Sequence, residues 1–285
     1  MKTKLQMILA VALFGTISLF VRNIPLTSGE VSLLRAVIAL ICLALYKLAK
    51  GEKIPLRGLG GELALLFLSG AAMGFNWIFL FEAYRYTTVS VATLSYYFAP
   101  VIVMVASPLL FHEKMTLWQV ICFVGSTIGL VMVINPTGLG DGGDPVRGVL
   151  FGLAAAALYA TVILLNKRTR KVSGTDRTML QFAFAIIVLL PYLLLTTGIH
   201  MQGMTTIGWL CLLAVGVLHS SVAYVMYFSS LKVLPGQESA ILSYIDPLVA
   251  VVISLTLLHE PVSVIQLVGG AMILAFTLAN ELKAE

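Results

Sequence analysis

The sequence predicts an all-α membrane protein with ten transmembrane helices, arranged as two inverted five-helix repeats around a central cavity. Hydrophobic residues make up 59% of the 285 residues and charged residues only 11%, which leaves too little polar surface to cover a soluble fold of this size. Long apolar stretches recur along the chain, and a spanning helix needs about 20 such residues. One set of residues also recurs at a fixed spacing between the two halves.

The predicted spans are continuously apolar and separated by short connections. They cover residues 5–21, 30–48, 63–83, 90–111, 117–134, 148–165, 179–197, 207–231, 237–258 and 262–282. A porin-like barrel is excluded, because its strands would be about ten residues long and would alternate in polarity. The first span follows Lys2 and Lys4 as a secretory leader would, but no small-x-small cleavage site comes after it, so we predict a first membrane helix.

The two halves end in copies of one pattern, in which each residue recurs 147 positions later. Pro100, Ser107, Leu110, His112, Glu113 and Gln119 return as Pro247, Ser254, Leu257, His259, Glu260 and Gln266. Five crossings per half is an odd number, so the second copy must enter the membrane upside down relative to the first. We therefore predict a first repeat over residues 1–136, an extracytoplasmic linker over 137–146 and a second repeat over 147–285.

The distribution of basic residues predicts the orientation. The net charge is +5, and most lysines and arginines lie in connections on the side that holds the N-terminus, whereas Arg22, Arg85 and Arg147 fall on the other side. Cytoplasmic connections carry the excess of Lys and Arg, so both termini are expected in the cytoplasm, with the chain in a bacterial or archaeal plasma membrane. This distribution also accounts for the basic pI without a nucleic-acid partner.

Enzyme and cofactor motifs are missing from the sequence. It contains no P-loop, no Gly-rich dinucleotide fingerprint, no HExxH helix and no nucleophile elbow, so neither an enzyme nor ATP-driven transport is expected. Cys42, Cys122 and Cys211 all lie within apolar spans, where thiols act as small hydrophobes. We therefore expect no disulfide framework, no metal site and no cofactor.

The chain resembles the drug/metabolite transporter (DMT) superfamily, in particular its ten-helix EamA-type branch. The residues that carry the resemblance are the run 28–35 (SGEVSLLR), the Pro100 and Pro247 helices that end in His-Glu, and the Gly-rich helices after Gln119 and Gln266. The resemblance covers essentially the whole chain. It implies a five-plus-five inverted repeat, a cavity lined by the first four helices of each half, packing roles for helices 5 and 10, and export of small metabolites or drugs.

Asp246 is the main candidate for chemistry within the membrane. It lies nine residues into its span, which places it roughly 13 Å deep at a rise of about 1.5 Å per residue. A carboxylate in hydrocarbon favours its neutral form, so Asp246 is expected to bind substrate and to exchange the coupling proton. No lysine or arginine is expected at that depth, and His219 is the nearest predicted partner. A neutral Asp246 that only forms hydrogen bonds, and a His219 that only joins helices, are the structural alternatives.

Arg35 and Glu82 form a second predicted pair. Both are expected toward the outer leaflet, and both are replaced by uncharged residues, Gln181 and Ser229, in the second half. A charge inside a membrane needs a partner, so we predict an ion pair that acts as a structural bridge or gate rather than as a substrate site.

Pro100 and Pro247 are predicted helix kinks. Each proline removes one helical hydrogen bond and frees the carbonyl four residues earlier, on Tyr96 and Ser243 respectively. Because both prolines fall near mid-span and recur by the repeat, they are expected to shape the cavity wall. Glu113 and Glu260 belong to the same repeated pattern and lie at the ends of the predicted helices, where a cap or a loop contact is expected.

Aromatic and polar residues at the same depth predict the lining of the site. The predicted substrate-binding residues are Asn76, Trp77, Tyr96, Tyr97, His219, Tyr244 and Asp246. Ring faces beside an acid suit amines, quaternary cations or zwitterionic amino acids, whereas an anion would need a basic residue there.

The sequence as a whole therefore predicts a secondary active transporter. It is expected to export a small-molecule substrate by alternating access, coupled to protons through Asp246, with the lipid bilayer as its surroundings. A passive channel or facilitator for small polar solutes is the alternative, and a lipid-modifying membrane enzyme is disfavoured because no second carboxylate or metal-ligand cluster gathers at one interface. Oligomeric state is left open, and a monomer fits the prediction because the duplication already builds a pseudo-dimer.

Overall fold

The computed structural model consists of helices throughout its described residues, which are 2–52, 59–111, 116–134, 144–169, 171–172, 174–234 and 236–283. The predicted linker and the His112-Glu113 pair lie largely outside these ranges. The helices are α1 (Lys2–Gly15), α2 (Ile17–Val21), α3 (Ser28–Ala49), α4 (Glu62–Tyr86), α5 (Val89–Tyr96), α6 (Ala99–Phe111), α7 (Leu117–Ile134), α8 (Pro145–Arg168), α9 (Gly174–Leu195), α10 (Thr206–Ala214), the π-helix η2 (Val215–Val222), α11 (Ala223–Leu231), α12 (Gly236–Ser243), α13 (Ile245–Thr256) and α14 (Val264–Lys283).

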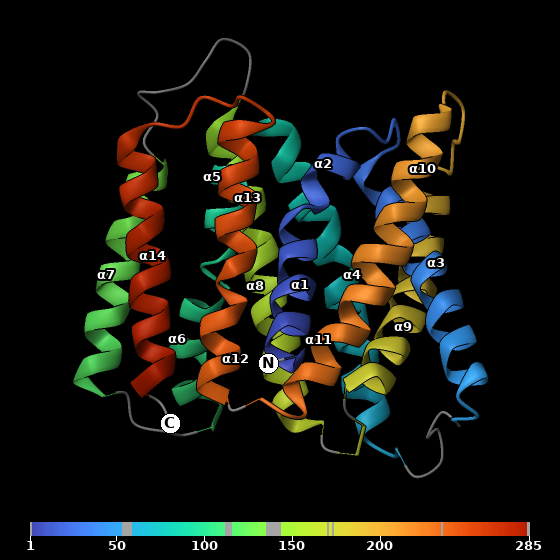
Figure 1. Cartoon of the computed structure of the whole chain (residues 1–285), viewed down its shortest axis with the longest axis horizontal. Helices are drawn as coiled ribbons and strands as arrows, with labels where there is room; N and C mark the ends of the chain where they lie inside the picture. Colours follow the sequence, from blue (N-terminus) through green and yellow to red (C-terminus); the bar gives the residue numbers. More distant parts are fainter. Residues whose placement is uncertain are drawn as a thin grey trace.

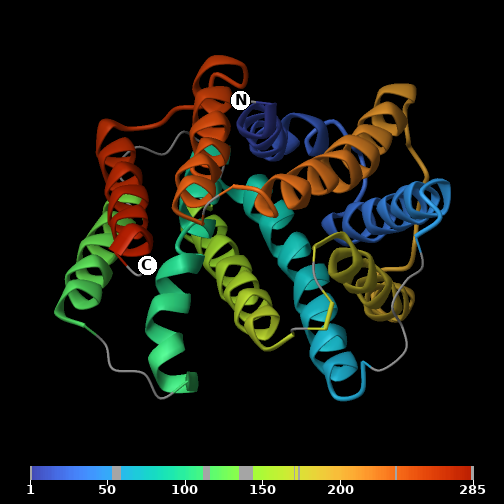
Figure 2. The same cartoon turned by 60° about the horizontal axis from the view of Figure 1, so that its bottom comes forward.

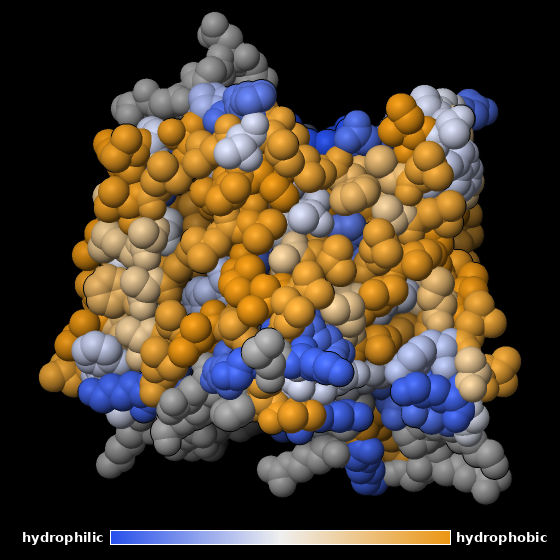
Figure 3. All heavy atoms as spheres, in the orientation of Figure 1, coloured by the Kyte–Doolittle hydropathy of each residue, from blue (hydrophilic) through white to orange (hydrophobic). Residues whose placement is uncertain are grey.

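The surface of the molecule matches a bilayer. Eight helical stretches among the described residues are long and apolar enough to span a membrane, and two shorter apolar helices, Leu117–Val133 and Ile241–Thr256, accompany them. Figure 3 shows a broad hydrophobic band around the middle of the molecule, with hydrophilic residues gathered toward its two ends. The protein is therefore an integral membrane protein.

Polar residues at the helix starts set where the helices begin. Thr27 caps α3 in a capping box with Glu30, whose carboxylate accepts from the Thr27 N–H at 2.8 Å. The recurring Gln119 and Gln266 have the same role at two other helices. Gln119 accepts from the Thr116 N–H at 2.8 Å before α7, and Gln266 accepts from the Ser263 N–H at 2.9 Å before α14. One repeated feature of the sequence thus encodes two equivalent helix starts.

Helices α7 and α14 pack against each other at one edge of the molecule, beside the remaining helices (Figures 1 and 2). Glycines bring their backbones together: a methyl group added at Gly129 would lie 2.6 Å from the Gly269 carbonyl oxygen. Close backbone approach through small residues is how membrane helices gain packing energy without a hydrophobic driving force.

Helix α4 runs through the interior and packs against α8 and α9. Gly70 and Gly74 on α4 face α9, where a methyl group on Gly70 would lie 2.6 Å from the Gln181 carbonyl oxygen. Buried residues of α3, α4, α9 and η2 form the largest apolar core, and Trp77, Phe81 and Phe182 are its aromatic members. This core supports one side of the polar region described next.

The predicted span positions agree with these helices, but several spans are divided. The predicted helix 1 is α1 plus α2, the stretch 90–111 is α5 plus α6, the stretch 207–231 contains η2, and the stretch 237–258 is α12 plus α13. Helix α8 begins at Pro145, because Asp144 caps its first turn by accepting from the Arg147 N–H. The helix therefore starts three residues before the predicted span 148–165.

Candidate functional site

Several membrane helices are interrupted near Asp246. Helix α1 gives way to α2 at Thr16, α5 gives way to α6 around Tyr97, and α12 gives way to α13 at Tyr244. A fourth segment widens into the π-helix η2. Irregular backbone within a membrane is tolerated where protein or a water-filled cavity satisfies the freed polar groups, and π-helical turns often mark functional sites.

Two of these interruptions are equivalent under the repeat. Tyr97 lies three residues before Pro100, and Tyr244 lies three residues before Pro247, so the two breaks are 147 residues apart. Proline lacks the N–H that would continue the helical ladder, and its ring clashes with the preceding turn. The same local sequence therefore ends a helix twice.

The α5–α6 and α12–α13 breaks bring Asp246 to Tyr97. The Tyr97 hydroxyl donates a hydrogen bond to Asp246 Oδ2 at 2.7 Å. Within the described part of the chain, Oδ1 of Asp246 accepts no hydrogen bond, and the residue stays partly exposed. Asp246 thus has one oxygen fixed by the protein and one oxygen open to a ligand or a proton.

Tyrosine rings form a wall beside this carboxylate. The ring of Tyr96 lies 6.0 Å from that of Tyr97 and 5.4 Å from that of Tyr159, and the Tyr97 ring lies 6.4 Å from that of Tyr244. Tyr244 is 8% exposed, and its hydroxyl has no hydrogen-bond partner among the described residues. The structure therefore gathers four predicted site residues, Tyr96, Tyr97, Tyr244 and Asp246, and adds Tyr159.

Gly15 allows the first helix to approach Asp246. A methyl group on Gly15 would lie 2.5 Å from the Asp246 carbonyl oxygen and 2.8 Å from Val249 Cβ. Only glycine permits that contact between α1 and α13 without a shift of the backbone. The sequence analysis did not identify Gly15 as a site residue, although it is the one glycine in the first span.

His219 does not pair with Asp246 as predicted. Its Nε2 is 2.9 Å from the Thr16 hydroxyl and its Nδ1 is 3.1 Å from the Ala214 carbonyl oxygen, and its ring lies against Phe20. The side chain is fully buried, and both ring nitrogens are already used. His219 therefore ties the π-helix η2 to the break between α1 and α2, one residue from Gly15.

Arg35 and Glu82 do not form the predicted ion pair. Glu82 pairs with Arg85, one turn further along α4, at 3.1 Å. Arg35 instead donates from Nε to the Ser220 hydroxyl at 3.0 Å, and its guanidinium lies 4.4 Å from the centre of the Trp77 ring. Stacking on an aromatic face and a hydrogen bond replace the carboxylate partner that charge alone suggested.

Arg35 lies beside the π-helix η2 rather than beside Glu82. Its partner Ser220 adjoins His219 on η2, and the residue is 4% exposed. The expectation that no basic residue shares this region is thus corrected, and Nη1 and Nη2 of Arg35 donate to none of the described residues.

Asn76 and Trp77 take part in packing around the site. The Asn76 amide donates to the Ala155 carbonyl oxygen at 2.6 Å, which joins α4 to α8. The Trp77 ring lies between Arg35 and Phe182, whose ring centre is 5.3 Å away. Both residues are buried, so they support the site from α4.

A cavity of about 620 Å³ lies at the upper end of the molecule as drawn in Figure 1. Figure 3 shows the surface hollowed there, with hydrophilic residues in the hollow. Arg22, Glu30, Arg85 and His200 provide its charged or titratable lining, and Phe81 and Tyr84 border it as well. Phe81 also lies 5.5 Å from the Arg35 guanidinium. Phe81 therefore borders both the cavity and the Arg35 guanidinium.

Three features of the site had no clear signal in the sequence. The π-helix is one, because its backbone N–H groups bond five residues back although its residue types also fit an α-helix; within it, the Ser220 hydroxyl donates to the Val215 carbonyl oxygen at 2.8 Å. The α1–α2 break at Thr16 is another, since no proline lies near it. The third is the partner of Arg35.

Among the described residues, no group of three His, Cys, Asp or Glu side chains is placed to hold a metal ion.

Comparison with known proteins agrees with this architecture. The chain is 27% identical over 280 residues to the uncharacterized transporter YxxF of Bacillus subtilis, covering 95% of this chain and 86% of that protein. It is 29% identical to an uncharacterized transporter of Archaeoglobus fulgidus, covering 94% and 92% respectively. A solved crystal structure matches 99% of the chain and 97% of its own length with a TM-score of 0.64, at 17% identity.

The family model gives the most specific match. It describes the EamA-like transporter family and matches this chain twice, over residues 1–135 and 146–280. The two matches together cover nearly all of the chain. The protein therefore belongs to the EamA-like transporter family of the drug/metabolite transporter superfamily.

Proposed function

We propose that this transporter is a secondary active carrier, with its substrate and coupling site around Asp246. The observation that carries the proposal is the meeting of interrupted helices at one carboxylate, with Gly15 packed on its backbone and Tyr97 bonded to its side chain. Secondary transporters place substrate and coupling ions at discontinuous helices near the bilayer midplane. The residues around Asp246 fit that pattern.

The carrier cycle requires two halves that move against each other. Two matches to one family model, two glutamine-capped helix starts and two proline-linked breaks support a duplicated five-helix unit. We propose that the copies are inverted in the membrane, with both termini in the cytoplasm, and that they rock around the site. Transport is proposed to run outward, the direction that the family resemblance implies.

Asp246 is the proposed coupling residue. Its open oxygen can hold either a proton or a cationic group, so binding of one would exclude the other. The tyrosine wall offers ring faces and hydroxyls to an amine, a quaternary cation or the ammonium group of an amino acid. Nη1 and Nη2 of Arg35 donate to none of the described residues, and they could donate to the carboxylate of a zwitterion.

Purified protein in proteoliposomes tests the coupling. Flux of a substrate identified by thermal-shift screening of amines, amino acids and cationic dyes is expected to rise with an imposed pH gradient. Asp246→Asn should abolish that response, because an amide cannot exchange the proton. Glu238→Gln is the control, since Glu238 pairs with Lys4 at the end of α12 that is opposite the break at Tyr244.

Two results would contradict the proposal. Flux that ignores the gradient and survives Asp246→Asn would remove the coupling role. Flux without counterflow or saturation would indicate a passive channel or facilitator in place of a carrier.

A further inference from the structure

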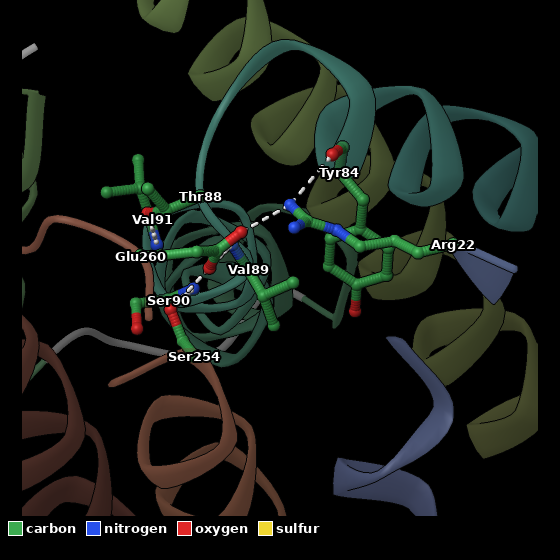
Figure 4. Close-up of polar contacts among 8 residues, drawn as sticks. All are labelled: Arg22, Tyr84, Thr88, Val89, Ser90, Val91, Ser254 and Glu260. Atoms are coloured by element: carbon green, nitrogen blue, oxygen red, sulfur yellow. Dashed lines mark hydrogen bonds and ion pairs between the residues drawn. The ribbon is translucent and has the colours of Figure 1, made fainter. Parts of the chain in front are cut away.

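Glu260 gathers several elements at the upper end of the molecule (Figure 4). Its Oε2 accepts from the Val89 N–H at 2.7 Å and from the Ser254 hydroxyl at 2.5 Å. Its Oε1 forms an ion pair with Arg22, which also donates to the Tyr84 carbonyl oxygen at 3.2 Å. One carboxylate therefore connects the ends of α2, α4, α5 and α13.

The carboxylate completes the start of α5. The first N–H groups of a helix have no partner within the helix, and here Glu260 accepts from Val89, Ser254 accepts from Ser90 at 3.4 Å, and Thr88 accepts from Val91 at 3.2 Å. The partial positive charge at a helix N-terminus also favours an anion there. A residue from one family match thus caps a helix from the other match.

The local backbone around Glu260 is specialised for this contact. His259 has a φ of +50°, the one left-handed non-glycine residue among those described. That turn lets the Glu260 N–H reach back to the Ser254 carbonyl oxygen at 2.9 Å. The glutamate side chain is 8% exposed, so its charge depends on Arg22 and the helix start rather than on water.

This cluster stands between the upper cavity and the interior. Arg22 and Tyr84 belong to both the cluster and the cavity lining. One turn below Val89 on α5 lies Thr93, which is 4% exposed and whose hydroxyl has no hydrogen-bond partner among the described residues. A further turn leads to Tyr97 and Asp246. Separation of α5 from Glu260 would therefore open a route from the cavity along α5 toward Asp246.

We infer that Glu260, Arg22 and the start of α5 form a latch that closes the outer end of the carrier. The inference rests on the proposed alternating-access function and adds its outer gate. The latch opens when Glu260 leaves the start of α5. The outer latch is closed in the structure described here.

Reactivity of a cysteine at position 93 tests the latch. In a background with Cys42, Cys122 and Cys211 replaced by alanine, Thr93→Cys is modified in intact membranes by a membrane-impermeant thiol reagent added outside. Glu260→Gln and Arg22→Gln are each expected to raise the modification rate about tenfold, because loss of the Arg22–Glu260 ion pair shifts the population toward the open state.

The matched control is Glu82→Gln. Glu82 lies at the same end, but its ion pair with Arg85 stays within α4, so the modification rate should not change. Arg22→Gln retains the Glu260 carboxylate but removes its cationic partner, and it decides the outcome if Glu260→Gln fails to elute as a folded protein. An unchanged rate in Arg22→Gln would overturn the inference.

Failure of the latch and failure of the carrier are separable. Counterflow and a pH-gradient response with no change at position 93 would refute the latch alone. Absence of counterflow in the wild-type protein would refute the carrier, whatever the labelling result.

Discussion

At the residue scale, the arrangement around Asp246 depends on a few close contacts. The sequence identified Asp246 because a carboxylate within an apolar span is costly, and it identified the tyrosines because they share its depth. The sequence did not identify the contact of Gly15, on α1, with the backbone of Asp246. Glycine is common in membrane helices, so its presence alone does not indicate a site. Gly15 thus influences the geometry around Asp246 more than its residue type indicates.

Gly15→Ala is expected to damage the site. The added methyl group would lie 2.5 Å from the Asp246 carbonyl oxygen, so α1 and α13 must separate. Overpacking of this kind costs about 1–3 kcal/mol, and we expect a lower thermal unfolding midpoint together with weaker substrate binding. Gly61→Ala is the control, because no atom lies within 4 Å of its added methyl group. Equal midpoints and affinities for the two variants would contradict the role of Gly15.

Side-chain partners were the least predictable feature. Glu82 has Arg85 within reach on its own helix, and an i,i+3 neighbour needs no tertiary arrangement to pair. That leaves Arg35 to Trp77 and Ser220, whose positions depend on how α4 and η2 pack. The charge pattern of the sequence therefore identified Arg35 and Glu82 as notable residues but did not predict their partners.

At the element scale, the paired helix breaks follow directly from the sequence. A proline recurs at the same place in both halves, and each recurrence ends a helix three residues earlier. The breaks at Thr16 and in η2 lack such a marker, because they arise from tertiary contacts such as the one between Thr16 and His219. Span positions were predictable from apolar length, whereas interruptions without proline were not.

Pro247→Ala is expected to remove transport without unfolding the protein. Alanine restores a backbone donor and favours a continuous helix from α12 into α13, which would rotate Asp246 away from the Tyr97 hydroxyl. Flux in proteoliposomes should fall at least about tenfold, as when a catalytic hydrogen bond loses its geometry, while the eluted protein stays monodisperse.

Pro191→Ala is the matched control for this substitution. Pro191 lies inside α9 on an exposed face of the helix, away from the breaks. We expect wild-type flux from this variant. Comparable losses in Pro191→Ala and Pro247→Ala would indicate a general effect on membrane helices and would contradict the special role of the break.

At the scale of the whole molecule, the recurring residues serve both structure and proposed movement. Gln119 and Gln266 cap the two helices that pack at the edge of the molecule, and Pro100 and Pro247 end helices at the site. Glu260 joins helices of both halves at the upper end. The duplication therefore places a cap and a break in each half, and two such units facing opposite directions would form one carrier.

The inverted arrangement is the claim on which the carrier cycle depends, and sided cysteine labelling tests it most directly. Leu117 and Val264 are equivalent residues at the starts of α7 and α14, and they are 77% and 75% exposed. Single cysteines at these positions, in the cysteine-free background, are probed with an impermeant thiol reagent on intact cells and on inside-out vesicles. Labelling of position 264 from outside and of position 117 from inside is the expected result. Labelling of both positions from the same side would contradict the inverted repeat and the alternating-access cycle with it.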